Sequence, residues 1–333
     1  MGGFRMRKSM KVAPGVRLNV SKRGVGASVG AGGVRYSAHS TGRRTVSARP
    51  GIPGGVYYQS TKGGSRKGSA SRPAAGSAPS SPATPSKPGL FAPKGEKELY
   101  KAIKAQDVQA IKRVGDEHPD FQVPAYSLAG LMVVTDEPQE SKRMLETVFA
   151  TGQDPAADKF VSKYLHTEME LQITPGVTAQ LPVSRDAVGL TLAELYQDEA
   201  ALDRAIETVE HLEPTTYAAV SLAELYVQAQ RYEDVIELTE GVENEDDASA
   251  LLLVFRGVAF REQGFHDAAH EAFKSALRSR SRAPAIRHHA LFERAQNYRA
   301  QGKASMARKD LERILAEDSD YEGVREQLAE LTS

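Results

Sequence analysis

The sequence predicts a multidomain α+β chain in which a small antiparallel β meander and a disordered linker precede an all-α helical-repeat solenoid. Three observations indicate this class. Apolar residues alternate with period two near the start, a stretch rich in Pro, Ser and Gly follows, and the pentapeptide Leu-Ala-Glu-Leu-Tyr at 192–196 recurs at 222–226. Self-similarity at a period of about 30 to 40 residues is typical of stacked helical repeats. The predicted boundaries are 1–58, 59–93 and 94–333.

Charge divides the chain into two parts of opposite sign. Residues 1–90 contain 16 Lys and Arg and no Asp or Glu, whereas residues 91–333 contain 27 basic and 43 acidic side chains. A basic arm on an acidic body indicates an anionic partner, or docking of one part of the chain on another. The absence of cysteine excludes disulfides, thiolate metal sites and cysteine nucleophiles. With no apolar run of signal-peptide or membrane-span length, we expect a cytoplasmic protein without a membrane span.

The alternation in residues 1–58 predicts short antiparallel strands with an apolar face and a basic face. Pro-Gly and Gly-Gly pairs mark the turns between them. A single sheet of this size cannot cover its own apolar face, so we expect a second copy of the module or another surface to cover it. A solvated or protein-docking role for the basic face is favoured over binding of nucleic acid or an anionic surface. The predicted basic face consists of Arg5, Arg7, Lys11, Arg17 and Arg35.

Three sequence blocks in this module carry a family resemblance. Residues 3–9, 14–22 and 51–54 agree in order and spacing with a bacterial family known as domain of unknown function 4236. The chain resembles that family over residues 2–58, and the resemblance implies no activity. The linker that follows, 59–93, is predicted to be a disordered basic tether because its composition cannot bury enough apolar surface to offset chain entropy.

The best-formed repeat begins near Ala250. Gly257, Phe260, Gly264 and Ala269 fall at the spacings of the tetratricopeptide repeat, in which small residues let two helices pack closely. The resemblance to this repeat covers about residues 186–320 in four units. Three departures stand out, because Val235 replaces the usual small residue and Ala200 and Gln230 replace the turn glycine. Two degenerate helix pairs are predicted before these units, over 99–114 and 128–149, and a capping helix after them, over 321–331.

The tetratricopeptide resemblance implies that the first helix of each pair lines a concave groove that holds peptides. Glu194 and Glu224 recur at the same groove position, and acidic residues beside apolar neighbours favour an extended basic segment. The chain's own N-terminal module is one candidate for that segment. The predicted groove positions are Leu190, Glu194, Gln197, Val220, Glu224, Gln228, Val254, Val258, Arg261, Phe292, Gln296 and Arg299.

A period-two pattern around Pro175-Gly176 predicts a β-hairpin near 169–182 that interrupts the helices. A structural role for this hairpin is favoured over a binding role. His266 and His270 have the spacing of zinc ligands, but no third ligand is apparent, and packing or surface roles are favoured. No catalytic triad, phosphate loop or nucleophile elbow is found. The sequence therefore predicts no enzyme activity, no cofactor and no metal.

These observations predict a non-enzymatic protein-interaction scaffold. It would bind a protein or peptide in an acidic and apolar groove, while the basic β module mediates self-assembly or docking. The alternative is an adaptor associated with nucleic acid or an anionic surface, whose basic module binds polyanion while the array recruits a partner. A homo-oligomer formed through the β module is compatible with either function.

Overall fold

The computed structural model describes the backbone of residues 8–13, 16–21, 24–31, 34–39 and 44–48, and residues 87–165 and 168–331 with their side chains. The predicted disordered linker therefore lies mostly outside the described residues. The chain divides into two compact units, and each is described by itself. One contains 171–181 and 185–333, and the other contains 7–170 and 182–184.

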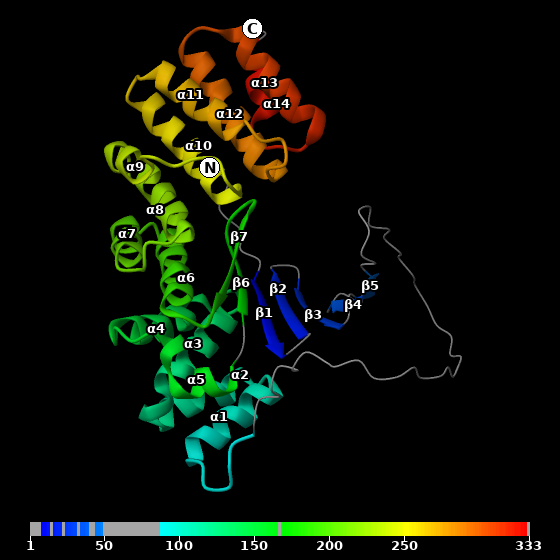
Figure 1. Ribbon diagram of the computed structural model, residues 1–333, viewed down its shortest axis with the longest axis vertical. Helices are drawn as coiled ribbons and strands as arrows, with labels where there is room; N and C mark the ends of the chain where they lie inside the picture. Colours follow the sequence, from blue (N-terminus) through cyan, green and yellow to red (C-terminus); the bar gives the residue numbers. More distant parts are fainter. Residues whose placement is uncertain are drawn as a thin grey trace, which may run out of the picture. The chain divides into compact units, whose positions relative to one another are not determined.

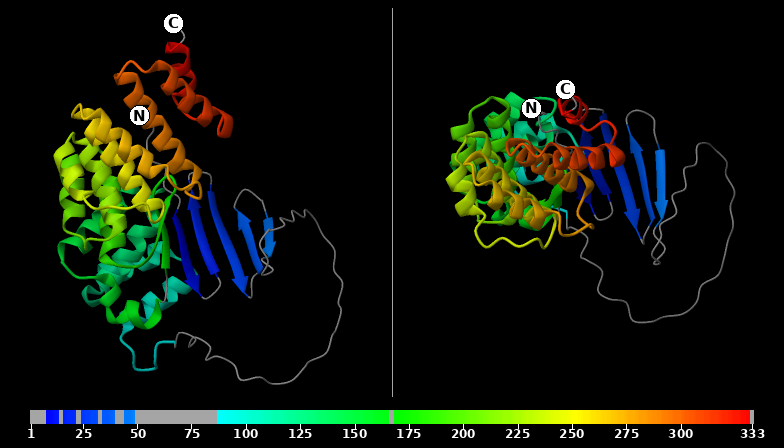
Figure 2. Two further views of the ribbon diagram at one scale, coloured as in Figure 1. Left: turned by 45° about the horizontal axis from the view of Figure 1, so that its top comes forward. Right: turned by 90° about the horizontal axis from the view of Figure 1, so that it is seen from above.

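The N-terminal strands form an antiparallel meander in which each strand pairs with the next along the chain (Figure 2). The register of the first pair shifts between Lys11 and Ala13. The antiparallel meander predicted from the alternation is therefore confirmed. Its strands are β1 (Lys8–Ala13), β2 (Val16–Ser21), β3 (Gly24–Ala31), β4 (Val34–His39) and β5 (Arg44–Ala48).

The strand register places the basic positions of the meander on one face. Lys11 is the direct partner of Arg17, Arg17 pairs with Ser28, and Arg35 pairs with Gly30 two residues further along β3. Direct cross-strand partners and residues two apart share a face of a sheet. Lys11, Arg17 and Arg35 therefore occupy positions of the same face, and the other two predicted members, Arg5 and Arg7, lie outside the described residues.

The same unit contains two helix pairs that pack closely through glycines. A Cβ atom on Gly130 would lie 2.7 Å from Cδ2 of Leu145, and one on Gly115 would lie 2.5 Å from the Tyr126 ring. These glycines allow the close approach of α3 to its neighbours. The helices are α1 (Lys94–Ala105), α2 (Val108–Glu117), α3 (Gln122–Val133), α4 (Pro138–Ala150) and the short α5 (Lys159–Tyr164), with 3-10 turns at Pro119–Phe121 and Pro155–Ala157.

The other unit is an array of antiparallel helix pairs that ends in a single helix (Figure 1). The first helices of the pairs are α6 (Arg185–Asp198), α8 (Thr216–Gln228), α10 (Asp247–Glu262) and α12 (Pro284–Ala300). The second helices are α7 (Leu202–Glu210), α9 (Tyr232–Leu238), α11 (His266–Ala276) and α13 (Ala304–Glu317). The capping helix is α14 (Val324–Glu330), whose Val324 is fully buried against Leu291 and Leu311.

The turn within each pair has the same backbone geometry whether or not glycine is present. Ala200, Gln230, Gly264 and Gly302 all have a positive φ, at 58°, 57°, 81° and 70°. In each turn the backbone N–H of the residue after the positive-φ position donates to the carbonyl of an aromatic residue five positions earlier. Examples are Ala201 to Tyr196 and Lys303 to Tyr298, at 2.8 Å each. This is the Schellman arrangement, which satisfies helix-terminal carbonyls and favours glycine at the left-handed position. The prediction that Ala200 and Gln230 occupy the position of the turn glycine is confirmed.

The packing of each pair also repeats. Ala205, Ala269 and Ala307 are fully buried at the equivalent position of their second helices, and Val235 is fully buried there in α9. On the first helix of the third pair, a Cβ atom on Gly257 would lie 2.5 Å from the Phe273 ring, so only glycine allows this approach. The fold class predicted from the sequence, a helical-repeat array preceded by a small antiparallel meander, is therefore confirmed.

A β-hairpin lies beside the first helices of the array (Figure 1). It consists of β6 (Glu168–Thr174) and β7 (Val177–Pro182), which are neighbours in a sheet and flank a turn at Pro175 and Gly176. Leu171, Val177 and Ala179 are buried. Gly176, at φ 94°, approaches α12 so closely that a Cβ atom would lie 3.0 Å from the Ile286 side chain. No helix among the described residues is long and apolar enough to span a membrane.

Candidate functional site

The apolar positions of the predicted groove belong to the core of the array. Leu190, Val220, Val254 and Val258 are all buried. They therefore contribute packing energy in this structure and do not form an open apolar floor. Binding at these positions stays a prediction, and it would require whatever covers them to move.

The hairpin covers the acidic part of the predicted groove. Strand β6 and the first helices α6 and α8 enclose only a small cavity of about 30 Å³. A space of this size holds about one water molecule, so the hairpin leaves little room between β6 and the two helices. The cavity is lined by Leu171, Gln172, Ile173, Leu190, Glu194, Gln197, Ser221 and Glu224.

Burial changes the chemistry of Glu224. Its side chain is enclosed and 7% exposed. Its pKa is raised to about 8, mainly because the carboxyl is removed from water; a hydrogen bond with Gln197 lowers the pKa, and the nearby charge of Glu194 raises it. Gln228 Nε2 also donates to Glu224 Oε1 at 3.4 Å. Glu224 is therefore mostly protonated at neutral pH and offers little negative charge to a basic ligand.

The predicted groove residues of α10 and α12 are engaged in contacts of their own. Arg261 donates to Glu293 at 2.5 Å, and Arg299 donates to Glu330 at 2.6 Å. The Phe292 ring lies 5.7 Å from the Tyr321 ring, measured between centroids. Gln296 and Gln197 are half-buried and Gln228 is exposed. The polar amides are thus the accessible members of the predicted set.

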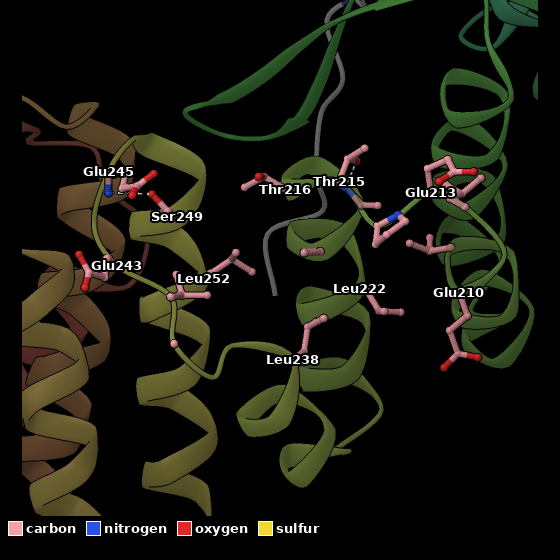
Figure 3. Close-up of a pocket in the computed structure, with 17 residues that line it drawn as sticks. Glu210, Glu213, Thr215, Thr216, Leu222, Leu238, Glu243, Glu245, Ser249 and Leu252 are labelled. Atoms are coloured by element: carbon pink, nitrogen blue, oxygen red, sulfur yellow. Dashed lines mark hydrogen bonds between the residues drawn. The ribbon is translucent and has the colours of Figure 1, made fainter.

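A much larger hollow lies elsewhere on the array, between α8 and α10 (Figure 3). This cleft, called the α8–α10 cleft below, has a volume of about 660 Å³. Its lining comes from the end of α7, the loop 211–215, α8, the end of α9, the loop 241–245 and the start of α10. Among the lining leucines, Leu252 is buried, while Leu212, Leu222 and Leu238 are half-buried. The cleft therefore exposes apolar surface to solvent.

The shortness of α9 explains why this surface is uncovered. Helix α9 has 7 residues, whereas the second helices α11 and α13 of the following pairs have 11 and 14. A helix of 7 residues spans only about 10 Å, so it cannot cover the full length of α8 and α10. Ala219 and Leu222 of α8 and Leu252 of α10 consequently line the cleft.

The loop after α9 is fixed in place by a buried asparagine. Asn244 Nδ2 donates to the carbonyls of Ser275 and Ala276 at 2.8 Å each, at the end of α11. Arg282 Nε donates to Asn244 Oδ1 at 2.7 Å. Two residues after Asn244, Asp246 and Ser249 form a capping box at the start of α10, a position where acidic residues stabilise a helix. The loop is therefore held by hydrogen bonds before any ligand arrives.

Acidic side chains surround the apolar floor. Figure 3 shows Glu243 and Glu245 on one side of the leucines and Glu210 and Glu213 on the other. No Lys, Arg or His is among the 17 lining residues, all of which lie in the described part of the chain. Glu210 accepts a hydrogen bond from Tyr226 at 2.8 Å. Glu213, Glu243 and Glu245 are exposed.

The α8–α10 cleft and the hairpin-covered surface lie on opposite faces of α8. Ser221 and Glu224 face the hairpin, whereas Ala219 and Leu222 line the cleft. Residues of an α-helix turn by about 100° each, so Leu222 and Glu224 point in directions about 160° apart. Sequence reasoning placed the acidic binding surface on the first of these faces and missed the second. The dense acidic run from Glu240 to Asp247 was the available signal.

The histidines considered as zinc ligands contact the neighbouring helix. A hydrogen bond of 2.9 Å joins His266 Nδ1 and Asn297 Oδ1, and the His270 ring lies 5.6 Å from the Tyr298 ring. These contacts give both side chains packing roles. Elsewhere in the described residues, Glu98, Glu117 and His118 bring three potential ligand atoms within 4.8 Å of one another. A hydrogen bond of 2.9 Å joins His118 Nε2 and Glu98 Oε2, and Lys94 pairs with the same glutamate at 3.6 Å, as in an ordinary surface network.

The fold and repeat geometry are those of a tetratricopeptide-like helical array, which a small antiparallel β meander precedes in the chain. Residues 4–59 match the family model described as protein of unknown function (DUF4236). Both resemblances inferred from the sequence are confirmed. A search of the curated proteins finds no match to this chain.

Several solved structures are similar to the chain. The N-terminal domain of the EccA1 ATPase from the ESX-1 secretion system of Mycobacterium tuberculosis aligns with a TM-score of 0.52 and 16% identity, covering 72% of this chain and 89% of that domain. This likeness shows the fold alone. TTC0263, a thermophilic TPR protein of Thermus thermophilus, aligns with a TM-score of 0.39 and 14% identity, covering 68% and 99% of the two chains. YrrB, a TPR protein with an unusual peptide-binding site, has a TM-score of 0.42 and 11% identity, covering 66% and 97%.

Proposed function

We propose that this chain is a non-enzymatic cytoplasmic scaffold that holds a partner polypeptide on its helical array. The basic meander would serve as a second attachment or self-assembly site. One observation carries the proposal: the first helices α6 and α8 already hold an extended strand, β6, against their shared face. A surface that accommodates one extended strand suits another, and a partner segment could continue along α10 and α12 or replace the hairpin.

Affinity capture with the full chain tests this proposal. The two accessible glutamines of the predicted groove, on α8 and α12, would be changed together as Gln228→Arg and Gln296→Arg. Matched controls are Gln263→Arg and Gln301→Arg, which follow the ends of α10 and α12. We expect the first pair to lower the recovery of partner proteins about ten-fold, an effect of about 1.4 kcal/mol, and the control pair to leave it unchanged. Equal recovery with both pairs would contradict binding on this face.

The meander supports a second candidate function, an adaptor that binds polyanion. The supporting observation is the register that puts Lys11, Arg17 and Arg35 on one face of the sheet. Binding of a short DNA duplex or RNA by the full chain would be measured between about 50 and 200 mM salt. A steep loss of affinity with salt, reduced in the variant K11Q, R17Q and R35Q, would favour the adaptor. Affinity that does not change with salt or with these substitutions would exclude it.

A further inference from the structure

We propose that the α8–α10 cleft is a second binding surface, separate from the hairpin-covered face, and that it takes an extended polypeptide segment in which Lys or Arg flank apolar side chains. The cleft lies on the opposite side of α8 from Glu224, so it remains available while the hairpin stays in place. The proposal does not rest on binding at the hairpin-covered face.

The chemistry of the lining selects this partner class. Leu222, Leu238 and Leu252 offer apolar surface that gains about 25 cal/mol for each Å² removed from water. Glu213, Glu243 and Glu245 stand around that surface with exposed carboxylates. A segment with apolar side chains but no cations would leave these charges unpaired, and an acidic segment would be repelled by them. A basic and apolar segment satisfies both parts of the site.

The size and rigidity of the cleft fit a short segment. Pockets of about 300 to 1,000 Å³ bury ligands the size of a few residues, and this cleft measures about 660 Å³. The loop that carries Glu243 and Glu245 is held through Asn244, which bonds the end of α11 and Arg282. A rim that is fixed before binding loses little conformational entropy when the ligand arrives.

A peptide with the sequence of residues 4–12 of this chain is a suitable probe. It contains four Lys or Arg and four apolar residues in close alternation. Its affinity for the full chain would be measured by fluorescence anisotropy at low and physiological salt. The rim variant is Glu213→Gln, Glu243→Gln and Glu245→Gln. The matched control is Glu312→Gln, Glu322→Gln and Glu326→Gln, which removes the same charge near the C-terminal end of the array.

We expect the rim variant to bind the peptide about ten-fold more weakly at low salt, because three exposed ion pairs each contribute modestly. The control variant should bind as the unchanged protein does. A peptide with Glu in place of its basic residues should show no binding, and one with Ser in place of its apolar residues should bind at least about ten-fold more weakly. A second cleft variant, Ala219→Phe, fills the space without changing the charge and should also weaken binding. Thermal unfolding of each variant verifies that it is folded.

Three results would overturn the proposal. The first is no peptide binding by the full chain at low salt, and the second is equal binding by the rim variant and its control. The third is a loss of binding on Glu224→Gln, which would place the peptide on the hairpin-covered face. If the peptide does not bind the cleft, the affinity capture with the Gln228 and Gln296 variants still tests the proposed function. The two proposals are therefore tested separately.

Discussion

The surfaces on the two sides of α8 contain glutamates that differ in what they can do. On one face Glu224 lies under β6 and has a pKa raised to about 8. On the other, Glu213, Glu243 and Glu245 surround an apolar cleft and remain exposed to water. The same residue type is thus a neutral, buried hydrogen-bonding group on one face and a charged surface group on the other. Acidic composition alone does not identify a binding surface for cations, because solvent access decides the charge.

The largest expected effect is a difference in stability loss between Leu→Ala substitutions on the two faces. Leu171→Ala removes a fully buried side chain of β6, and we expect it to lower the free energy of unfolding by about 2 to 5 kcal/mol. Leu222→Ala, in the half-buried lining of the cleft, should cost less than about half as much because less apolar area leaves contact. Urea unfolding of both variants measures the difference. Equal losses would show that Leu171 of the hairpin buries no more apolar surface than Leu222 in the cleft.

Glu224→Gln should increase stability in a pH-dependent way. Well below pH 4.5 the carboxyl is protonated in both the folded and the unfolded state, so it contributes no difference in stability. As the pH rises from 4.5 towards 8, the unfolded state loses its proton while the folded state keeps it, and the unchanged protein loses stability. The Gln side chain does not titrate, so the free energy of unfolding of the variant should be higher than that of the unchanged protein by about 2 kcal/mol or more at pH 8. Urea unfolding at pH 5 and pH 8 measures this, and a difference that shrinks as the pH rises would contradict the assigned burial.

Asn244→Ala tests whether the loop of the cleft is fixed. The substitution removes the donor that satisfies two carbonyls at the end of α11 and the acceptor for Arg282. We expect a loss of about 2 kcal/mol in stability, together with faster amide hydrogen exchange in 239–246. Gln228→Ala, on the other face of α8, serves as the control and should leave this loop protected. Unchanged exchange in the loop would show that other contacts hold it.

The smallest effect concerns the turns of the first two pairs. Ala200 and Gln230 have φ values of 58° and 57°, which side chains with a Cβ atom adopt only with strain. Ala200→Gly and Gln230→Gly should each stabilise the protein by about 0.5 to 1 kcal/mol, as judged by thermal unfolding. The reverse change, Gly264→Ala at φ 81°, is the matched control and should destabilise by about 1 kcal/mol. A loss of stability in the two glycine variants would mean that their side chains make contacts worth more than the strain.

The sequence predicted the repeated parts of this fold because their causes are local. The pentapeptide at 192–196 and 222–226 places a buried Ala and a buried Tyr at equivalent positions of α6 and α8. The left-handed turn at Ala200 and Gln230 likewise follows from the position of each residue in the repeat. Alternation of apolar residues was sufficient to predict the meander.

The candidate sites were harder to predict because they depend on contacts between distant segments. Strand β6 covers Glu194 and Glu224, and no pattern within either helix encodes this cover. The cleft depends on α9 ending at Leu238 and on Asn244 reaching α11, which is 31 residues further along the chain. Helix ends and long-range hydrogen bonds are set by tertiary packing, so the acidic run 240–247 did not by itself locate the cleft.

A side-chain NMR titration of Glu224 tests the contrast between the two faces most directly. With carboxyl carbons labelled with ¹³C in glutamate, and Glu224→Gln used to assign the resonance, its pKa would be read in the full chain. The structure predicts a pKa of about 8, because β6 excludes water from this carboxyl. A pKa near the ordinary value of 4.5 would show that the hairpin leaves this face open, and the distinction between the two faces of α8 would fail.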